Sequence, residues 1–162
     1  MKIEKNQVIG MGDFLVSRDP SLVLTTCAIG SCLAIAAHDA SAQVGGVLHF
    51  ILPNSHLDKT MAKFQPGMFG DTGLAAFLKE LALQGARPES TAVKLAGGSV
   101  VLEELATYDI GTVNVQTARQ ILRDQGMAIV SEETGGRGIR SLKLEISTGR
   151  VTVRHQNQSK DI

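Results

Sequence analysis

Apolar residues occur in short runs bounded by turn residues along much of this chain, a pattern that predicts β-strands. Two other segments, residues 71–84 and 112–125, repeat apolar positions at helical spacing, and a glycine follows each. We expect Asp71 to cap the first of these helices. The polar, irregular residues 53–70 before it predict a long loop, which in a compact domain often carries function. The predicted strands are residues 14–17, 22–26, 32–37, 44–52, 91–96, 127–131, 142–146 and 151–154.

Strands at both ends of the chain with two helices between them favour an α+β fold. The expected architecture is a layered α/β sandwich of mostly antiparallel strands with two main helices. No internal repeat or low-complexity linker divides the chain, so we expect one domain over residues 1–155. Residues 156–162 are predicted to form a polar C-terminal tail that frays.

The runs 32–37 and 44–52 flank a small polar segment and predict a β-hairpin. If its turn is centred between residues 40 and 41, residues whose numbers add to 81 face one another. Cys32 and His49 are such a pair, and directly opposed side chains have Cβ atoms about 5 Å apart. This register predicts a thiol beside an imidazole, the pairing of cysteine nucleophiles. A slip of one residue would send the two side chains to opposite faces.

The residue types alone leave other readings open. A cysteine in a strand is commonly a small buried hydrophobe, and a histidine in an apolar strand is commonly a core residue with its hydrogen bonds made. Cys32, however, follows Gly30 and Ser31, where a tight turn leaves N–H groups free to hold an oxyanion. Thr26 can orient the second ring nitrogen of His49, although a β-branched residue also simply suits a strand.

Composition narrows the possible partners. The 16 basic and 16 acidic side chains cancel, and the chain has one Tyr and no Trp, so nucleic-acid binding is not expected. No apolar stretch approaches the roughly 18 residues of a membrane span, and the N-terminus lacks the pattern of a signal peptide. We therefore expect a cytoplasmic protein with reduced thiols, which disfavours a disulfide between Cys27 and Cys32.

Metal binding is the competing use of these residue types. Cys27, Cys32, His38 and His49 supply the sulfur and nitrogen donors that zinc prefers. The predicted strand nevertheless puts His38 about 20 Å from Cys32, at the strand's other end. We expect neither a metal nor a cofactor.

Two segments of the chain match a known family. Residues 26–32 read Thr-Cys-Ala-Ile-Gly-Ser-Cys, and residues 45–53 read Gly-Gly-Val-Leu-His-Phe-Ile-Leu-Pro. Both resemble the chemoreceptor glutamine deamidases of bacterial chemotaxis, the CheD family. The likeness continues through residues 94–99, 110–114 and 135–140, and it covers about residues 22–154. Cys27 and Ala28 depart from the Leu-Gly that is usual in the family.

The resemblance implies a function for each candidate residue. Cys32 would be the nucleophile, His49 the general base and acid, and Thr26 the residue that orients His49. Backbone N–H groups of Ser31 and Cys32 would hold the oxyanion. The domain would then hydrolyse glutamine side chains of methyl-accepting chemoreceptors to glutamate and ammonia through a Cys32 thioester, without a cofactor.

The resemblance also leaves other functions open. Many family members bind a phosphatase of the CheC type, and some are credited with methylesterase activity on receptor glutamates. A regulatory module without catalysis, which binds receptors or such a phosphatase, is a further alternative. The residues do not distinguish amide from ester substrates.

Overall fold

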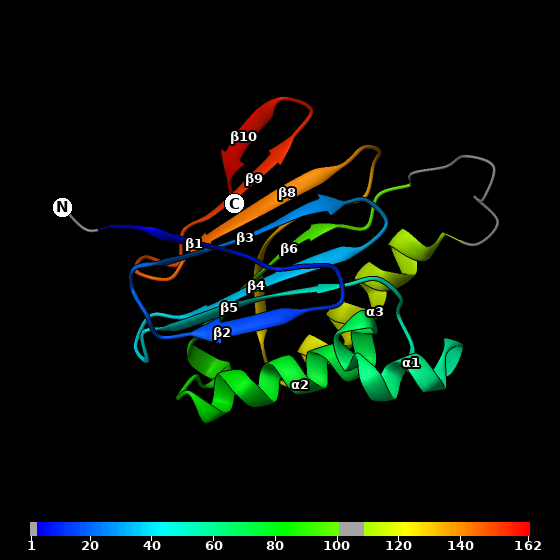
Figure 1. Cartoon of the computed structure of the whole chain (residues 1–162), viewed down its shortest axis with the longest axis horizontal. Helices are drawn as coiled ribbons and strands as arrows, with labels where there is room; N and C mark the ends of the chain where they lie inside the picture. The colour runs from blue at the N-terminus through cyan, green and yellow to red at the C-terminus, as the bar shows by residue number, and fades with distance from the viewer. Residues whose placement is uncertain (1–2, 101–108) are drawn as a thin grey trace.

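The computed structural model describes residues 3–100 and 109–162, which form two β-sheets and a layer of helices (Figure 1). The central sheet has five strands in the order β2 (Phe14–Ser17), β5 (Val44–Phe50), β4 (Leu33–Asp39), β6 (Thr91–Gly97), β7 (Ala128–Thr134). The outer sheet has five strands in the order β1 (Lys5–Val8), β3 (Leu22–Ile29), β8 (Arg140–Glu145), β9 (Val151–His155), β10 (Gln158–Asp161).

The helices cover the face of the central sheet that points away from the outer sheet (Figure 1). Among the described residues, only the pairs β1–β3 and β6–β7 are parallel. These findings confirm the predicted α+β sandwich of mostly antiparallel strands with two main helices. The helical elements are α1 (Lys59–Phe64), α2 (Gly70–Leu83), α3 (Ile110–Asp124) and the 3₁₀ turns η1 (Ser55–Leu57), η2 (Pro66–Met68) and η3 (Pro88–Ser90).

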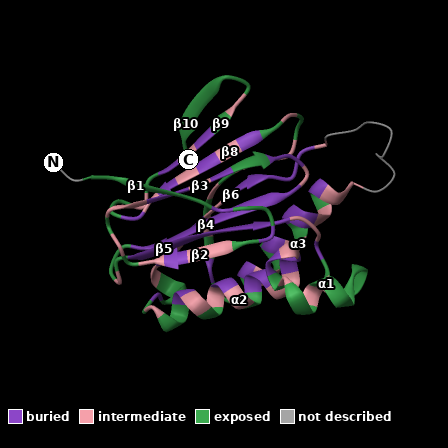
Figure 2. Ribbon diagram, in the orientation of Figure 1, coloured by how far each residue is buried: buried purple, intermediate pink, exposed green. Residues whose placement is uncertain are grey.

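The central sheet is buried on both faces, as Figure 2 shows for β4 and β5. Successive residues of β4 point to opposite sides. Leu33 and Ile35 pack with residues of α2 and α3, whereas Ala34 and Ala36 pack with Leu142 and other residues of the outer sheet. Burial on both faces explains why these strands appear in the sequence as continuous apolar runs.

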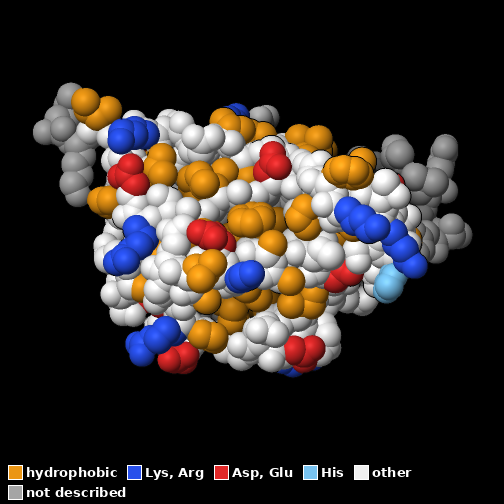
Figure 3. Space-filling view, turned by 60° about the horizontal axis from the view of Figure 1, so that its bottom comes forward, with side chains coloured by type: hydrophobic (Ala, Val, Ile, Leu, Met, Phe, Trp, Pro, Cys, Tyr) orange, Lys and Arg blue, Asp and Glu red, His pale blue; other side chains and the backbone are white. Residues whose placement is uncertain are grey.

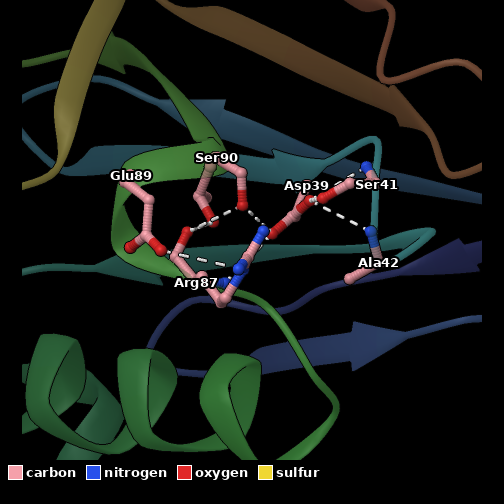
Figure 4. Close-up of polar contacts among 7 residues, drawn as sticks. Asp39, Ser41, Ala42, Arg87, Glu89 and Ser90 are labelled. Carbon is pink, nitrogen blue, oxygen red and sulfur yellow. Dashed lines mark hydrogen bonds and ion pairs between the residues drawn. The ribbon is translucent and has the colours of Figure 1, made fainter.

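The turn between β4 and β5 is longer than the sequence suggested, and this corrects the predicted register. Asp39 closes the turn: its Oδ1 accepts hydrogen bonds from the Ser41 N–H, the Ser41 hydroxyl and the Ala42 N–H (Figure 4). Gln43 completes it with a φ of 53°, in the left-handed region. Four residues therefore separate the paired residues Asp39 and Val44, and facing residues have numbers that add to 83.

The same carboxylate ties the hairpin to the rest of the sheet. Oδ2 of Asp39 accepts hydrogen bonds from the Arg87 N–H and the Ser90 hydroxyl, just before β6 (Figure 4). Burial raises the pKa of the Asp39 carboxyl, but the hydrogen bonds from Ser90 and Ser41 outweigh it and hold the pKa well below its usual range. Asp39 is therefore charged, fully buried and hydrogen-bonded on both oxygens.

Three further local predictions are wrong. Residues 53–70 are not an open loop, because they form η1, α1 and η2. The N-cap residue of α2 is Phe69, whereas Asp71 accepts hydrogen bonds from the Ser55 N–H and hydroxyl and so fastens η1 to α2. The polar tail is not frayed, since β10 pairs with β9. The side chains of β10 are all exposed, so the strand is ordered by its backbone hydrogen bonds to β9 and shows no apolar pattern in the sequence.

Candidate functional site

Cys32 and His49 lie on the same face of the hairpin, but they are not directly opposed. Ala34 is the residue that pairs with His49 in the ladder between β4 and β5. Cys32 lies two residues before Ala34, just ahead of β4, and both belong to the apolar cluster between the sheets. The predicted register was thus wrong by two residues, a shift that keeps side chains on the same face. Both side chains are buried.

The predicted contact between Thr26 and His49 is present. Thr26 Oγ1 lies 2.7 Å from His49 Nδ1 and donates its hydrogen to the backbone oxygen of Ile9 at 2.8 Å. A hydroxyl has one hydrogen to give, so Thr26 must accept the hydrogen carried by Nδ1. The other ring nitrogen, Nε2, is then unprotonated, and it is buried without a hydrogen-bond partner in the part of the chain that the structure describes.

Burial shifts the pKa values of both residues toward their neutral forms. It lowers the pKa of His49 from 6.5 to about 4, because the imidazolium loses its hydration in the core. It also raises the pKa of the Cys32 thiol, although the backbone N–H groups of Cys32 and Gly30 act in the opposite direction. At neutral pH the site therefore holds a thiol and a neutral imidazole with a free nitrogen lone pair.

The turn that carries Cys32 is held by the end of β6. The Gly98 N–H donates to the Cys32 oxygen at 2.7 Å, and the Ser99 N–H donates to the Gly30 oxygen at 2.9 Å. Gly97 has a φ of 121°, and a Cβ there would collide with the Cys32 backbone oxygen. The pair Gly97-Gly98, which the sequence presented only as a turn, thus fixes the backbone of the candidate nucleophile.

Asn114 is a further residue at the site to which sequence reasoning gave no role. It is fully buried on α3, and its Nδ2 donates hydrogen bonds of 2.9 Å to the backbone oxygens of Ser31 and Ile51. A signal was present in the sequence, because Asn114 precedes Ala118 and Leu122 at intervals of four on the buried stripe of the helix. A polar residue on such a stripe needs a partner.

The other sequence candidates lie apart from this site. Both cysteines are free, and Cys27 is exposed. His38 pairs with Gly45 toward the far end of β4, and one of its ring nitrogens lies 2.9 Å from the oxygen of Ile146. The described residues contain no group of three or more metal-ligating side chains close enough to hold a metal ion, and no helix among them is long and apolar enough to cross a membrane.

An apolar groove of about 550 Å³ lies on the helical face, between α2 and α3. Figure 3 shows this face, where hydrophobic side chains lie among scattered charges. Leu78, Ile121 and Met127 are among the residues that line the groove, and none of the lining residues belongs to the site around Cys32.

Comparison with known proteins gives a consistent result. The family model described as CheD chemotactic sensory transduction matches residues 51–155. The chain is 40% identical to the "Probable chemoreceptor glutamine deamidase CheD 1" of Syntrophus aciditrophicus, over 91% of this chain and 92% of that protein. It is 36% identical to the "Chemoreceptor glutamine deamidase CheD" of Thermotoga maritima, over 91% and 90%. The chain therefore belongs to the CheD family.

Proposed function

We propose that this protein is a chemoreceptor glutamine deamidase in which Cys32 is the nucleophile and His49 the general base and acid. The observation that carries the proposal is the buried His49 ring, which lies on the same face of the β4–β5 hairpin as Cys32. Thr26 Oγ1 holds its Nδ1, and its Nε2 has no hydrogen-bond partner among the described residues. A base of this kind is what a protonated thiol needs to attack a carboxamide.

The chemistry follows from the resting protonation. Cys32 Sγ attacks the carbonyl carbon of a glutamine side chain while its proton passes to His49 Nε2, which forms a tetrahedral oxyanion. When the oxyanion collapses, the C–N bond breaks and the proton from His49 leaves with ammonia, so that a thioester remains. His49, neutral again, takes a proton from water as it attacks the thioester. Glutamate is released, and His49 returns the proton to Cys32.

Backbone groups stabilise the negative charge in this scheme. The Cys32 and Gly30 N–H groups lie close enough to the Cys32 thiol to lower its pKa, so the turn already presents donors at the reacting sulfur. We assign the N–H groups of Ser31 and Cys32 to the oxyanion, and one well-placed donor of this type contributes about 3 kcal/mol to the transition state. No step requires a cofactor.

The relatives' names specify chemoreceptors. We propose that the substrates of this protein are methyl-accepting chemoreceptors and that it acts in the cytoplasm. A phosphatase of the CheC type is a proposed partner as well. Such a partner is tested by adding it to the assay: binding without any Cys32-dependent reaction would support a regulatory module instead of an enzyme.

The deciding experiment is mass spectrometry of a chemoreceptor fragment incubated with the wild type, Cys32→Ala and Cys27→Ala. We expect the wild type and Cys27→Ala to raise the mass of the target glutamine peptides by about 1 Da, with equimolar ammonia, and Cys32→Ala to do neither. Cys27→Ala is the matched control because it removes an exposed thiol five residues away. Full conversion by Cys32→Ala would refute the mechanism. A fragment that carries methyl esters, treated in parallel, measures the methylesterase alternative.

A further inference from the structure

Asn114 joins the two halves of the site from the opposite side of the central sheet. Its Nδ2 donates to the backbone oxygen of Ser31, one residue before Cys32, and to that of Ile51, two residues after His49. One amide group on α3 thus bridges two segments. The first is the turn at residues 30–32 that carries the candidate nucleophile (the nucleophile turn), and the second is the chain that follows β5, the strand of the candidate base. Among the described residues, no other side chain makes such a bridge.

This bridge comes at a cost in stability. Asn114 is fully buried, and its Oδ1 has no hydrogen-bond partner among the described residues. An unpaired buried carbonyl is unfavourable, and an apolar side chain on this stripe of α3 would avoid it. The reverse orientation of the amide would point Oδ1 at two carbonyl oxygens, so the two N–H donors are the useful part of the side chain.

The bond to Ser31 also sets a direction. The Ser31 carbonyl and the Cys32 N–H belong to one planar trans peptide, in which the C=O and N–H bonds point opposite ways. Fixing the carbonyl toward Asn114 therefore aims the Cys32 N–H away from α3. A hydrogen bond to the carbonyl also polarises the peptide and makes its N–H a better donor.

We propose that Asn114 is a positioning residue: it aims the Cys32 N–H at the oxygen of the reacting carbonyl and holds the nucleophile turn at its working distance from His49. The expected effect on the reaction rests on the proposed function, whereas the hydrogen bonds of Asn114 do not depend on it. It predicts an effect on the chemical step and not on substrate binding, since Asn114 is buried away from any substrate.

The first test separates kcat from KM for glutamine deamidation of a chemoreceptor fragment. We expect Asn114→Ala to lower kcat by about tenfold to a hundredfold, less than the loss of a whole oxyanion donor, with KM within twofold of the wild type. Asn114→Leu keeps a similar volume but has no hydrogen-bond donor, so we expect a comparable loss of kcat. If alanine prevents folding, Asn114→Leu still separates the loss of the two N–H donors from the loss of packing, because it fills the same volume.

Leu122→Ala is the matched control. Leu122 is fully buried on the same helix, two turns further along, and its side chain packs in the apolar cluster between the helices and the central sheet without donating a hydrogen bond. We expect it to lower stability while leaving kcat within twofold of the wild type. If Asn114→Ala and Leu122→Ala lose kcat in proportion to their loss of stability, or if Asn114→Leu keeps the wild-type kcat, the positioning role is refuted.

A second test does not depend on the proposed function. In a Cys27→Ser background, Cys32 is the single thiol, and its alkylation by iodoacetamide is followed from pH 6 to 11. We expect Asn114→Ala to move the midpoint to higher pH, because the thiolate loses an aligned N–H donor. An unchanged midpoint would contradict the inference. If the wild type deamidates nothing, the proposed function fails, and this profile still decides the role of Asn114.

Discussion

Removal of the Thr26 hydroxyl offers the sharpest test of how His49 is held. Thr26→Val keeps the shape and the strand preference of the side chain but takes away the acceptor for His49 Nδ1 and the donor to Ile9. Two buried polar groups then lose their partners, at about 1–3 kcal/mol each. The hydroxyl itself no longer has to be desolvated, which returns part of this cost. We expect a net loss of roughly 2–4 kcal/mol in the free energy of unfolding.

Urea denaturation measures this loss as a lower midpoint at constant slope. Thr25→Val on the same strand is the control, because Thr25 is partly exposed and makes no side-chain hydrogen bond in the described structure. Thr26→Ser, which restores the hydroxyl, should recover most of the stability. We also expect Thr26→Val to lower kcat at least about tenfold, because both imidazole tautomers become populated. A Thr26→Val midpoint equal to that of Thr25→Val would refute the hydrogen-bond assignment.

Three further predictions concern other parts of the structure. His49 takes up a proton near pH 6.5 in the unfolded chain but only near pH 4 in the folded chain. Lowering the pH from 6.5 to 4 should therefore reduce the free energy of unfolding of the wild type by about 3 kcal/mol. His49→Gln should lack this loss, and urea denaturation midpoints measure it in both proteins. Asp39→Asn should lower the free energy of unfolding by about 2 kcal/mol, since Oδ2 accepts two hydrogen bonds that an amide nitrogen cannot accept; an unchanged denaturation midpoint would contradict this. Gly97→Ala should lower both stability and kcat more than Gly135→Ala, because both have positive φ but only Gly97 lies against the backbone of Cys32, and equal effects would argue against that contact.

Much of the fold could be predicted from the sequence because most strands and both long helices bury an apolar face. β2 matches its predicted bounds, and α2 and α3 begin and end within two residues of theirs. β1 and β10 were missed for the converse reason, since all their side chains are exposed and backbone pairing alone orders them. Segments ordered by backbone hydrogen bonds leave little trace in a hydrophobic pattern.

One side chain, Asp39, explains why the predicted register of the hairpin was wrong. The predicted turn was centred between residues 40 and 41. An aspartate at the start of a turn, however, commonly accepts hydrogen bonds from the backbone N–H groups that follow it. Asp39 does this and lengthens the turn, which moves the partner of His49 from Cys32 to Ala34. The shared face survived only because the error was an even number of residues.

The contacts that hold the site were beyond sequence reasoning for a different reason. Gly97, Gly98 and Asn114 reach the nucleophile turn from segments more than 60 residues away, and they act on backbone carbonyls, not on the candidate side chains. Cys32 and His49 lie on neighbouring segments, and their spacing in the sequence therefore indicated that they share a face. The supports required the packing of β6 and α3 around them.

Burial gives the candidate pair a resting state with consequences for reactivity. A raised pKa at Cys32 and a lowered pKa at His49 both disfavour a thiolate–imidazolium pair, so in the proposed reaction charge develops only while the substrate is attacked. Backbone N–H groups are then the main compensation for that charge, because the described residues place no cationic side chain in contact with Cys32. The direction of these N–H groups depends on the peptide that Asn114 fixes.

Because burial raises the pKa of Cys32, we expect iodoacetamide at neutral pH to modify the exposed Cys27 well before Cys32. Mass spectrometry of the alkylated peptides measures that order. Faster labelling of Cys32 would mean that Cys32 and His49 rest as a thiolate–imidazolium pair.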